Sequence, residues 1–182
     1  MSIVAPRPGG LGSPSGLSTL GSTAPKRLVV GIGELAVARG AGDEIVTFAL
    51  GSCIAVCLWD SARGVAGLLH YLLPEARINP DRAKAQPEAF ADTGIPILLE
   101  KFVAAGGHPK QSLVKIIGGA EVAGPNSLNV GRRNILAAKN VLWKHGLLIK
   151  TQLVGGNAAR TVYLSAGTGR VKVTSGNEVA EL

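Results

Sequence analysis

The sequence predicts an α+β fold, a sandwich of mixed or antiparallel β-sheets with two main helices. Short runs rich in Val, Ile and Leu recur along the chain between turns that contain Gly or Pro, which is typical of strands. Several runs follow one another as hairpins, and this grouping argues against a doubly wound parallel sheet, in which strands and helices alternate. Two further segments have apolar residues at helical spacing.

The N-terminal segment differs in composition from the rest of the chain. Residues 1–27 are rich in Gly, Pro, Ser and Thr and lack a periodic apolar face, so they predict a flexible tail. Residues 28–182 predict a single domain, because a chain of 182 residues with 46% hydrophobic residues can bury one sizeable core. No apolar run approaches the roughly 18 to 20 residues of a membrane-spanning helix, and the N-terminus lacks the apolar stretch of a secretory signal. We therefore expect a cytoplasmic protein without membrane insertion.

The β-type runs predict eight strands. They cover residues 28–37, 44–50, 53–60, 64–74, 113–120, 147–154, 159–166 and 170–175. Gly40 and Gly42 are expected to make the turn after the first strand. A polar cluster at residues 60–64 predicts a hairpin between the third and fourth strands, and residues 167–169 predict another between the last two.

Two helices are expected. The first runs through residues 95–105, with Asp92 or Thr93 as its N-cap and a pair of glycines as its stop. The second covers residues 132–145, where apolar residues again recur at helical spacing. The polar segment before the first helix, residues 75–91, contains two prolines and predicts a long surface loop, a type of segment that often has a functional role.

The charge of the chain points to an acidic partner. The formal net charge is +7, and the excess of Lys and Arg is concentrated in the second half. Such an excess favours binding to an acidic surface. Nucleic acid is the alternative, but only 4% of the residues are aromatic and no recognised nucleic-acid motif occurs. We therefore expect no nucleic-acid binding.

The stretch TFALGSCIAVC, residues 47–57, raises the possibility of a catalytic cysteine. A cysteine attacks as thiolate and needs a base, because an ordinary thiol is only slightly ionised at neutral pH. His70 is the candidate base for Cys53, since the predicted hairpin can bring the two side chains together. Spacing alone leaves a second interpretation open, in which both residues are buried for structural reasons.

The neighbours of Cys53 have candidate roles of their own. Gly51 and Ser52 allow a sharp turn before Cys53, and their amides, or that of Cys53, could stabilise an oxyanion. The hydroxyl or carbonyl of Thr47 could fix the tautomer of His70. Alternation along the strand places Cys57 on the same face as Cys53, but its apolar surroundings indicate a buried packing residue.

A metal site is not expected. Structural zinc usually takes four protein ligands, and the two cysteines with the dispersed His70, His108 and His145 do not have the usual paired spacing.

Seven segments occur in an order that is typical of one protein family. They are VGIGELAV, VTFALGSCIAVCLWD, GVAGLLHYLLP, FADTGIPILLE, KIIGGA, NVGRRN and VGGNAAR. Together they resemble the CheD family of chemoreceptor glutamine deamidases, over about Val30 to Val173. The LGSC element and the H-x-x-LP element at this separation are quite specific. One departure is Ala159, which stands where many relatives have glycine.

The resemblance implies a function and the residues that perform it. The family's nucleophilic cysteine falls on Cys53, its histidine on His70 and its threonine on Thr47. Members hydrolyse selected glutamine side chains of methyl-accepting chemotaxis receptors to glutamate, without a cofactor, and some also bind the CheC phosphatase. The implied fold is a sandwich similar to the catalytic domain of deamidating necrotizing toxins. The implied chemistry is attack by the Cys53 thiolate and hydrolysis of a thioester with His70 as base.

A binding module is the competing hypothesis from another class. In that case the chain docks on receptors or on a CheC-type phosphatase, and any hydrolysis is incidental. The presence of Thr47, Cys53 and His70 together favours the enzyme, because an adaptor has no need for all three.

Overall fold

The computed structural model describes residues 25–121 and 129–182. The tail expected at 1–27 therefore lies outside the described residues except for its last three positions. Ten strands in the described part form two sheets of five strands each. The first sheet has the order β1 (Arg27–Val30), β3 (Glu44–Leu50), β8 (Arg160–Ser165), β9 (Val171–Ser175) and β10 (Glu178–Glu181). The second has the order β2 (Glu34–Ala38), β5 (Val65–Tyr71), β4 (Ile54–Asp60), β6 (Leu113–Gly118) and β7 (Ile149–Val154).

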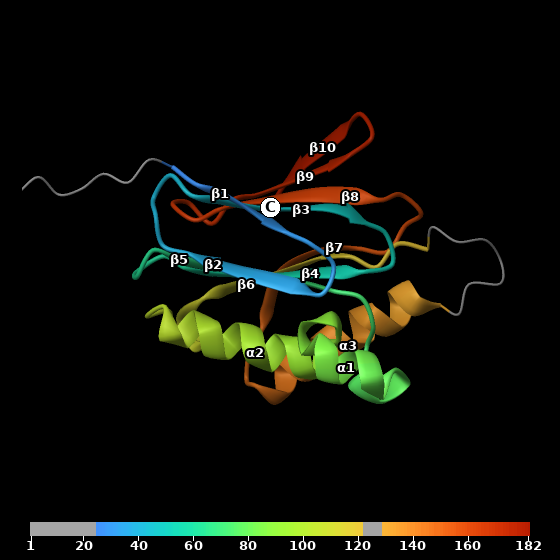
Figure 1. Cartoon of the computed structure of the whole chain (residues 1–182). Helices are drawn as coiled ribbons and strands as arrows, with labels where there is room; N and C mark the ends of the chain where they lie inside the picture. The colour runs from blue at the N-terminus through green and yellow to red at the C-terminus, as the bar shows by residue number, and fades with distance from the viewer. Residues whose placement is uncertain (1–24, 122–128) are drawn as a thin grey trace, which may run out of the picture.

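The sheets and helices form three layers (Figure 1). The two sheets face each other, and α2 (Ala91–Ala104) and α3 (Val130–Lys144) cover the outer face of the second sheet. The shorter helices are η1 (Ala76–Ile78), α1 (Pro80–Ala85), η2 (Pro87–Ala89) and η3 (Pro109–Gln111). Both sheets are mixed, since β1 pairs with β3 in parallel and β6 pairs with β7 in parallel while their other pairs are antiparallel. The predicted α+β sandwich is thereby confirmed.

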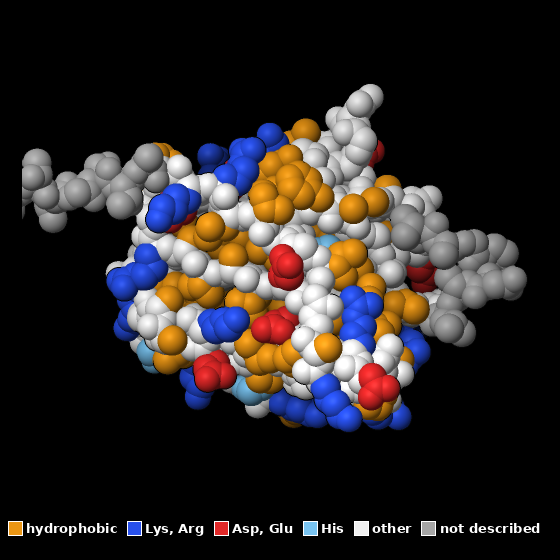
Figure 2. All heavy atoms as spheres, viewed as in Figure 1, with side chains coloured by type: hydrophobic (Ala, Val, Ile, Leu, Met, Phe, Trp, Pro, Cys, Tyr) orange, Lys and Arg blue, Asp and Glu red, His pale blue; other side chains and the backbone are white. Residues whose placement is uncertain are grey.

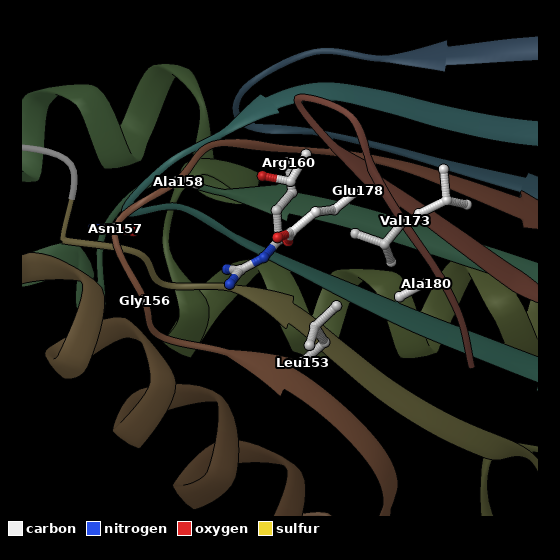
Figure 3. A pocket seen from close by; sticks show the side chains of 10 residues that line it. Leu153, Gly156, Asn157, Ala158, Arg160, Val173, Glu178 and Ala180 are labelled. Carbon is white, nitrogen blue, oxygen red and sulfur yellow. The ribbon is translucent and has the colours of Figure 1, made fainter.

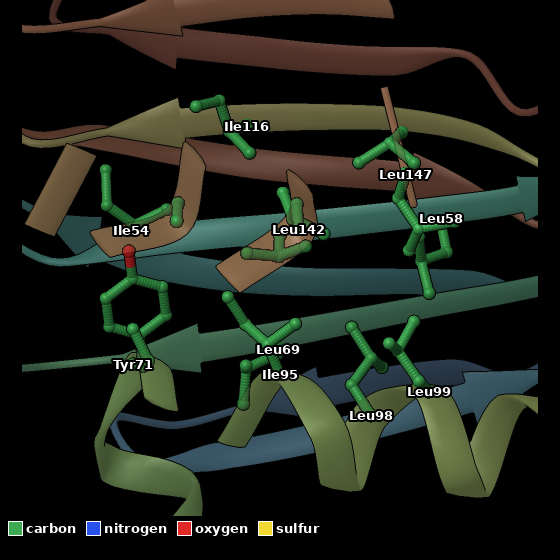
Figure 4. Close-up of a cluster of buried hydrophobic side chains, with 14 of the residues drawn as sticks. Ile54, Leu58, Leu69, Tyr71, Ile95, Leu98, Leu99, Ile116, Leu142 and Leu147 are labelled. Carbon is green, nitrogen blue, oxygen red and sulfur yellow. The ribbon is translucent and has the colours of Figure 1, made fainter. Parts of the chain in front are cut away.

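The two faces of β4 belong to two different cores. Ile54, Val56 and Leu58 pack under the helices, in the cluster drawn in Figure 4. Cys53 and Cys57 lie on the opposite face, between the sheets. This is the alternation that the apolar run predicts for a strand, and it decides that Cys53 faces the inter-sheet space.

The prediction of a single strand at residues 28–37 is wrong. The run is split into β1 and β2, which lie in different sheets. Gly33 at the break has φ 73°, a conformation that glycine adopts without strain. Apolar content is high on both sides of the break, so composition alone did not reveal that the chain passes from one sheet to the other there.

The loop expected at 75–91 is also wrong, because this segment contains η1, α1 and η2. Asn79 caps α1, since its side chain accepts a hydrogen bond from the Arg82 amide and Pro80 occupies the first helical position. Neither expected cap of α2 acts as one. The Asp92 carboxylate instead accepts from the Ala76 amide, and the hydroxyl of Thr93 donates to the Pro87 carbonyl.

The second helix and the C-terminal hairpin agree with the sequence pattern within about two residues. One strand was missed: β10 pairs antiparallel with β9 across a short turn. Its polar residues and short length gave no clear strand pattern. In the described part of the chain, none of the helices has both the length and the apolar character required to cross a membrane.

Candidate active site

Thr47, Cys53 and His70 all face the space between the two sheets. Thr47 lies on β3 of the first sheet, His70 lies on β5 of the second, and Cys53 immediately precedes β4. Ala55 is the direct partner of His70 in the β4–β5 pair, so Cys53 and His70 are diagonal neighbours on one face. All three are nearly or fully buried, with exposed fractions of 0%, 6% and 0% in the order Thr47, Cys53, His70.

A hydrogen bond between the sheets assigns the tautomer of His70. The hydroxyl of Thr47 donates its only proton to the Val30 carbonyl, over 2.7 Å. It must therefore accept from His70 Nδ1, which lies 2.7 Å away. The neutral imidazole consequently carries its proton on Nδ1 and a lone pair on Nε2. Nε2 is buried and has no hydrogen-bond partner among the described residues, so it is free to accept a proton.

Burial keeps the Cys53 thiol and the His70 imidazole neutral at neutral pH. Desolvation raises the pKa of the Cys53 thiol to about 11, against smaller opposing effects of its own backbone amide and of Arg82. Desolvation likewise lowers the pKa of His70 to about 4, partly offset by the nearby Glu34 carboxylate. A preformed thiolate–imidazolium pair is therefore disfavoured at neutral pH. A nucleophilic role for Cys53 would therefore require transfer of its proton to His70 during the attack.

The low pKa of His70 predicts a loss of stability in acid. The folded protein resists protonation of His70 until about pH 4, whereas the unfolded chain binds that proton at its usual pKa of 6.5. As pH falls through this window the unfolded state binds more protons, so the free energy of unfolding should decrease, by roughly 3 kcal/mol in total. Urea unfolding at several pH values between about 4 and 6.5 measures how steeply the free energy of unfolding depends on pH. His70→Asn should make this pH dependence shallower, while substitution of the exposed His145 by Asn should leave it unchanged. An equal pH dependence in the wild type and both variants would contradict the prediction.

The backbone before Cys53 is irregular. The β3–β8 register shifts between Thr47 and Leu50, and Ala49 has φ 55°, a left-handed conformation that is uncommon outside glycine. The amide of Gly51 donates to the Ala49 carbonyl over 2.9 Å, so it is not available as an oxyanion donor. The amides of Ser52 and Cys53 donate to no backbone carbonyl in the described part of the chain, and that of Cys53 contacts only its own thiol. These two amides are therefore candidate donors to a substrate oxygen.

Residues 118–120, from the KIIGGA segment, hold the turn that presents Cys53. The Gly119 amide donates to the Cys53 carbonyl over 2.7 Å, and the Ala120 amide donates to the Gly51 carbonyl over 2.8 Å. Gly118 has φ 114°, and a Cβ built on it would lie only 2.2 Å from the Cys53 carbonyl oxygen. Only glycine fits this position, because both the conformation and the close approach exclude a side chain.

Gly118→Ala is expected to damage both stability and the site. A methyl group would force the Cys53 carbonyl away, at a cost of about 2–4 kcal/mol in the free energy of unfolding. Gly64→Ala is the matched control: Gly64 also has positive φ, but a Cβ there meets nothing within 4 Å. Gly64→Ala should lower the free energy of unfolding by only about 1 kcal/mol. Chemical denaturation measures the loss in the free energy of unfolding for each variant. Equal losses would contradict the conclusion that only glycine fits at position 118.

Arg160 supports the same turn from its far side. Its guanidinium donates to the carbonyls of Gly118, over 3.3 Å, and Gly155, over 2.7 Å. Burial lowers the pKa of Arg160. Figure 3 shows its side chain beside a cavity of about 480 Å³. Thr47, Cys53 and His70 are not among the residues that line this cavity.

Two residues near the site were missed by sequence reasoning. Arg82 acts on the Cys53 thiol from α1, in a segment that the sequence predicted to be a loop. Asn134 of α3 donates to the Ser52 carbonyl. It belongs to the NVGRRN segment, so its place in that motif was the available signal. Residues 25–121 and 129–182 contain no cluster of three or more His, Cys, Asp or Glu side chains that could hold a metal ion.

Comparison with known proteins identifies the family. A family model described as CheD chemotactic sensory transduction matches residues 72–175, more than half of the chain. The chain belongs to the CheD family. A CheD relative from Syntrophus aciditrophicus, named probable chemoreceptor glutamine deamidase CheD 1, is 42% identical over 157 residues, covering 85% of this chain and 98% of the relative.

Other CheD relatives span a similar length. Proteins named probable chemoreceptor glutamine deamidase CheD from Solibacter usitatus and Methanococcus vannielii are 36% and 39% identical. The first match covers 86% of this chain and 94% of the relative, and the second covers 85% and 99%. A match of that length within 182 residues necessarily includes residues 47–70. The CheD resemblance inferred from the motifs is thereby confirmed.

Proposed function

We propose that this CheD-family chain is a chemoreceptor glutamine deamidase, which converts specific glutamine side chains of methyl-accepting chemotaxis receptors to glutamate with release of ammonia. The names of its relatives support this activity. The observation that carries the mechanism is the hydrogen bond from His70 Nδ1 to Thr47, which leaves Nε2 unpartnered on the face occupied by Cys53. In this proposal Cys53 is the nucleophile, His70 the general base and acid, and Thr47 the residue that orients the imidazole.

The first half of the proposed reaction forms a thioester. His70 Nε2 takes the thiol proton of Cys53 as the sulfur attacks the carboxamide carbon, and the amides of Ser52 and Cys53 stabilise the resulting oxyanion. The imidazolium then gives its proton to the amide nitrogen. The C–N bond breaks, and ammonia leaves.

The second half hydrolyses the thioester. His70 takes a proton from water, and the oxygen attacks the thioester carbon. The C–S bond breaks, the proton returns from His70 to the Cys53 sulfur, and the substrate side chain leaves as a carboxylic acid, which loses its proton to solvent and becomes a carboxylate. Thr47 accepts from Nδ1–H throughout, so Nε2 faces the reaction in both halves.

Charge and partners fit the same proposal. Lys and Arg side chains are spread over the face shown in Figure 2, and the formal net charge of the chain is +7. This excess would steer the enzyme to acidic receptor helices in the cytoplasm, in a manner that salt weakens. We place catalysis in one domain, residues 28–182, preceded by the tail. A CheC-type phosphatase is a second candidate partner.

The direct test is deamidation of a receptor. The purified full chain is incubated with a cytoplasmic receptor fragment, ammonia release is measured, and peptide mass spectrometry locates each conversion of glutamine to glutamate. Site-specific conversion supports the proposal. A wild-type protein that binds the fragment but releases no ammonia would favour the binding module instead.

Thr47→Val is expected to lower kcat about 10- to 100-fold, with little change in KM. Valine keeps the shape of threonine but leaves His70 Nδ1–H and the Val30 carbonyl without their shared partner. Thr47→Ser retains the hydroxyl and should recover most of the rate. Steady-state kinetics on the receptor fragment check this order, and a fully active Thr47→Val would exclude the orienting role.

A further inference from the structure

Asn134 is a buried polar residue that connects the two halves of the site. It lies near the start of α3 and has no exposed surface. Its side-chain amide donates to the Ser52 carbonyl over 2.9 Å and to the Leu72 carbonyl over 2.8 Å. Ser52 directly precedes Cys53, and Leu72 follows His70 by two residues. One side chain from the helical layer therefore joins the backbone that holds the nucleophile to the backbone that holds the base.

A third hydrogen bond anchors Asn134 itself. The Tyr71 hydroxyl, drawn in Figure 4, donates to the Asn134 carbonyl over 2.6 Å. This contact ties the start of α3 to the second sheet without using the Asn134 side chain. Its effect can consequently be separated from the two bonds that the side chain makes.

The orientation of the Asn134 amide follows from its partners. Both partners are carbonyls, which only accept, so the nitrogen must point to them. The Asn134 Oδ1 atom is then buried with no partner in the described part of the chain. An unpartnered buried acceptor costs about 1–3 kcal/mol. The amide is thus a poor means of adding bulk stability at this position, and its two donors are its specific contribution.

We propose that Asn134 is a positioning residue that holds Cys53 in register with His70. Without its two donors, the Ser52 and Leu72 carbonyls lose their partner and the turn before Cys53 is free to shift relative to β5. A displacement of about 1 Å between reacting groups can cost on the order of 100-fold in rate. The reaction itself depends on the proposed function, but the pairing of Cys53 with His70 can be measured without any receptor.

The test is a double-mutant cycle on cysteine alkylation. Iodoacetamide reacts with the full-length protein at neutral pH, and peptide mass spectrometry distinguishes Cys53 from Cys57. His70→Ala should slow alkylation of Cys53 at least about tenfold, because the base that receives the thiol proton is lost. In the Asn134→Ala background the same substitution should change the rate less than about twofold. The ratio compared is the Cys53 alkylation rate with His70 divided by the rate with His70→Ala, in the same background. Unlike a single rate, this ratio is insensitive to a change in the exposure of Cys53.

Three further variants separate positioning from stability. Asn140→Ala alters an exposed asparagine of the same helix and should retain the tenfold ratio. Tyr71→Phe removes the anchor but keeps both amide bonds, so it should lower the melting temperature while retaining the ratio. Asn134→Asp is close in size to asparagine but cannot donate to both carbonyls, and it should lose the ratio even if Asn134→Ala does not fold.

The possible outcomes distinguish the two proposals. The positioning role would be overturned if His70→Ala still slowed alkylation tenfold in a folded Asn134 variant. It would also be overturned if Tyr71→Phe, with the same melting temperature as the Asn134 variant, lost the effect of His70→Ala to the same extent. If the ratio behaves as expected but wild-type protein deamidates no receptor fragment, the deamidase proposal fails while the positioning role stands. On an active enzyme, Asn134→Asp should lower kcat about 10- to 100-fold with KM nearly unchanged.

Discussion

Cys53→Ala is expected to abolish glutamine deamidation, lowering kcat by at least about 10⁴-fold. The substitution removes the sulfur at the turn held by Gly119 and Ala120, on the face of the sheet that also holds His70. No covalent intermediate can then form. Ammonia release from a receptor fragment measures the loss, and circular dichroism verifies that the variant is folded.

Cys57→Ala is the matched control for the nucleophile. Cys57 lies on the same face of β4, and burial raises the pKa of its thiol to about 12. We expect this variant to lose some stability and to retain its activity. Undiminished deamidation by Cys53→Ala would remove the proposed mechanism. Full chemotactic signalling in cells by a Cys53→Ala protein that is inactive in vitro would instead favour the binding module.

His70→Asn is expected to lower kcat about 10²- to 10⁴-fold with little effect on KM. The amide of asparagine can replace Nδ1 as a donor to Thr47, but no group replaces Nε2. Combining it with Cys53→Ala should cause no further loss, since the two groups act as a unit. The exposed His108→Asn serves as the control and should remain active. Equal activities of His70→Asn and wild type would exclude His70 as the base.

The pH profile gives an independent check on His70. Because burial lowers its pKa to about 4, the acid limb of kcat/KM should lie near that value and below the usual 6.5 of an imidazole. The rate falls as pH drops through this value, because protonated His70 cannot accept the thiol proton. An acid limb at 6.5 would mean that the site is more hydrated than its burial indicates.

Much of the local structure could be predicted from the order of residues along the chain. The hairpin of β4 and β5 follows from two apolar runs around a polar turn, and alternation places Cys53 and Cys57 on one face. Spacing alone, however, left Cys53 and His70 open to a purely structural interpretation. The order of the LGSC, H-x-x-LP and later motifs favoured the catalytic one. The family that these motifs indicated is confirmed, and the catalytic role of the two residues stays a prediction.

Other features depend on contacts between distant segments. The splitting of residues 28–37 between two sheets and the strand β10 depend on packing partners that no local pattern identifies. The same holds for the positive φ of Gly118, which follows from its approach to the Cys53 carbonyl. The helix α1 does have a local signal, because Asn79 followed by Pro80 is a typical helix start.

The strands at Cys53 and His70, and the faces on which these side chains lie, were thus determined locally, because alternation with period two needs only neighbouring residues. The chemical state of the two side chains was decided by the tertiary structure. Burial between the sheets shifts the pKa values of Cys53 and His70, and a hydrogen bond from one sheet to the other assigns the imidazole proton. Asn134, 82 positions beyond Ser52, then joins the two strand ends. Desolvation and hydrogen bonding act on groups that are close in space, and only the folded chain makes these groups neighbours.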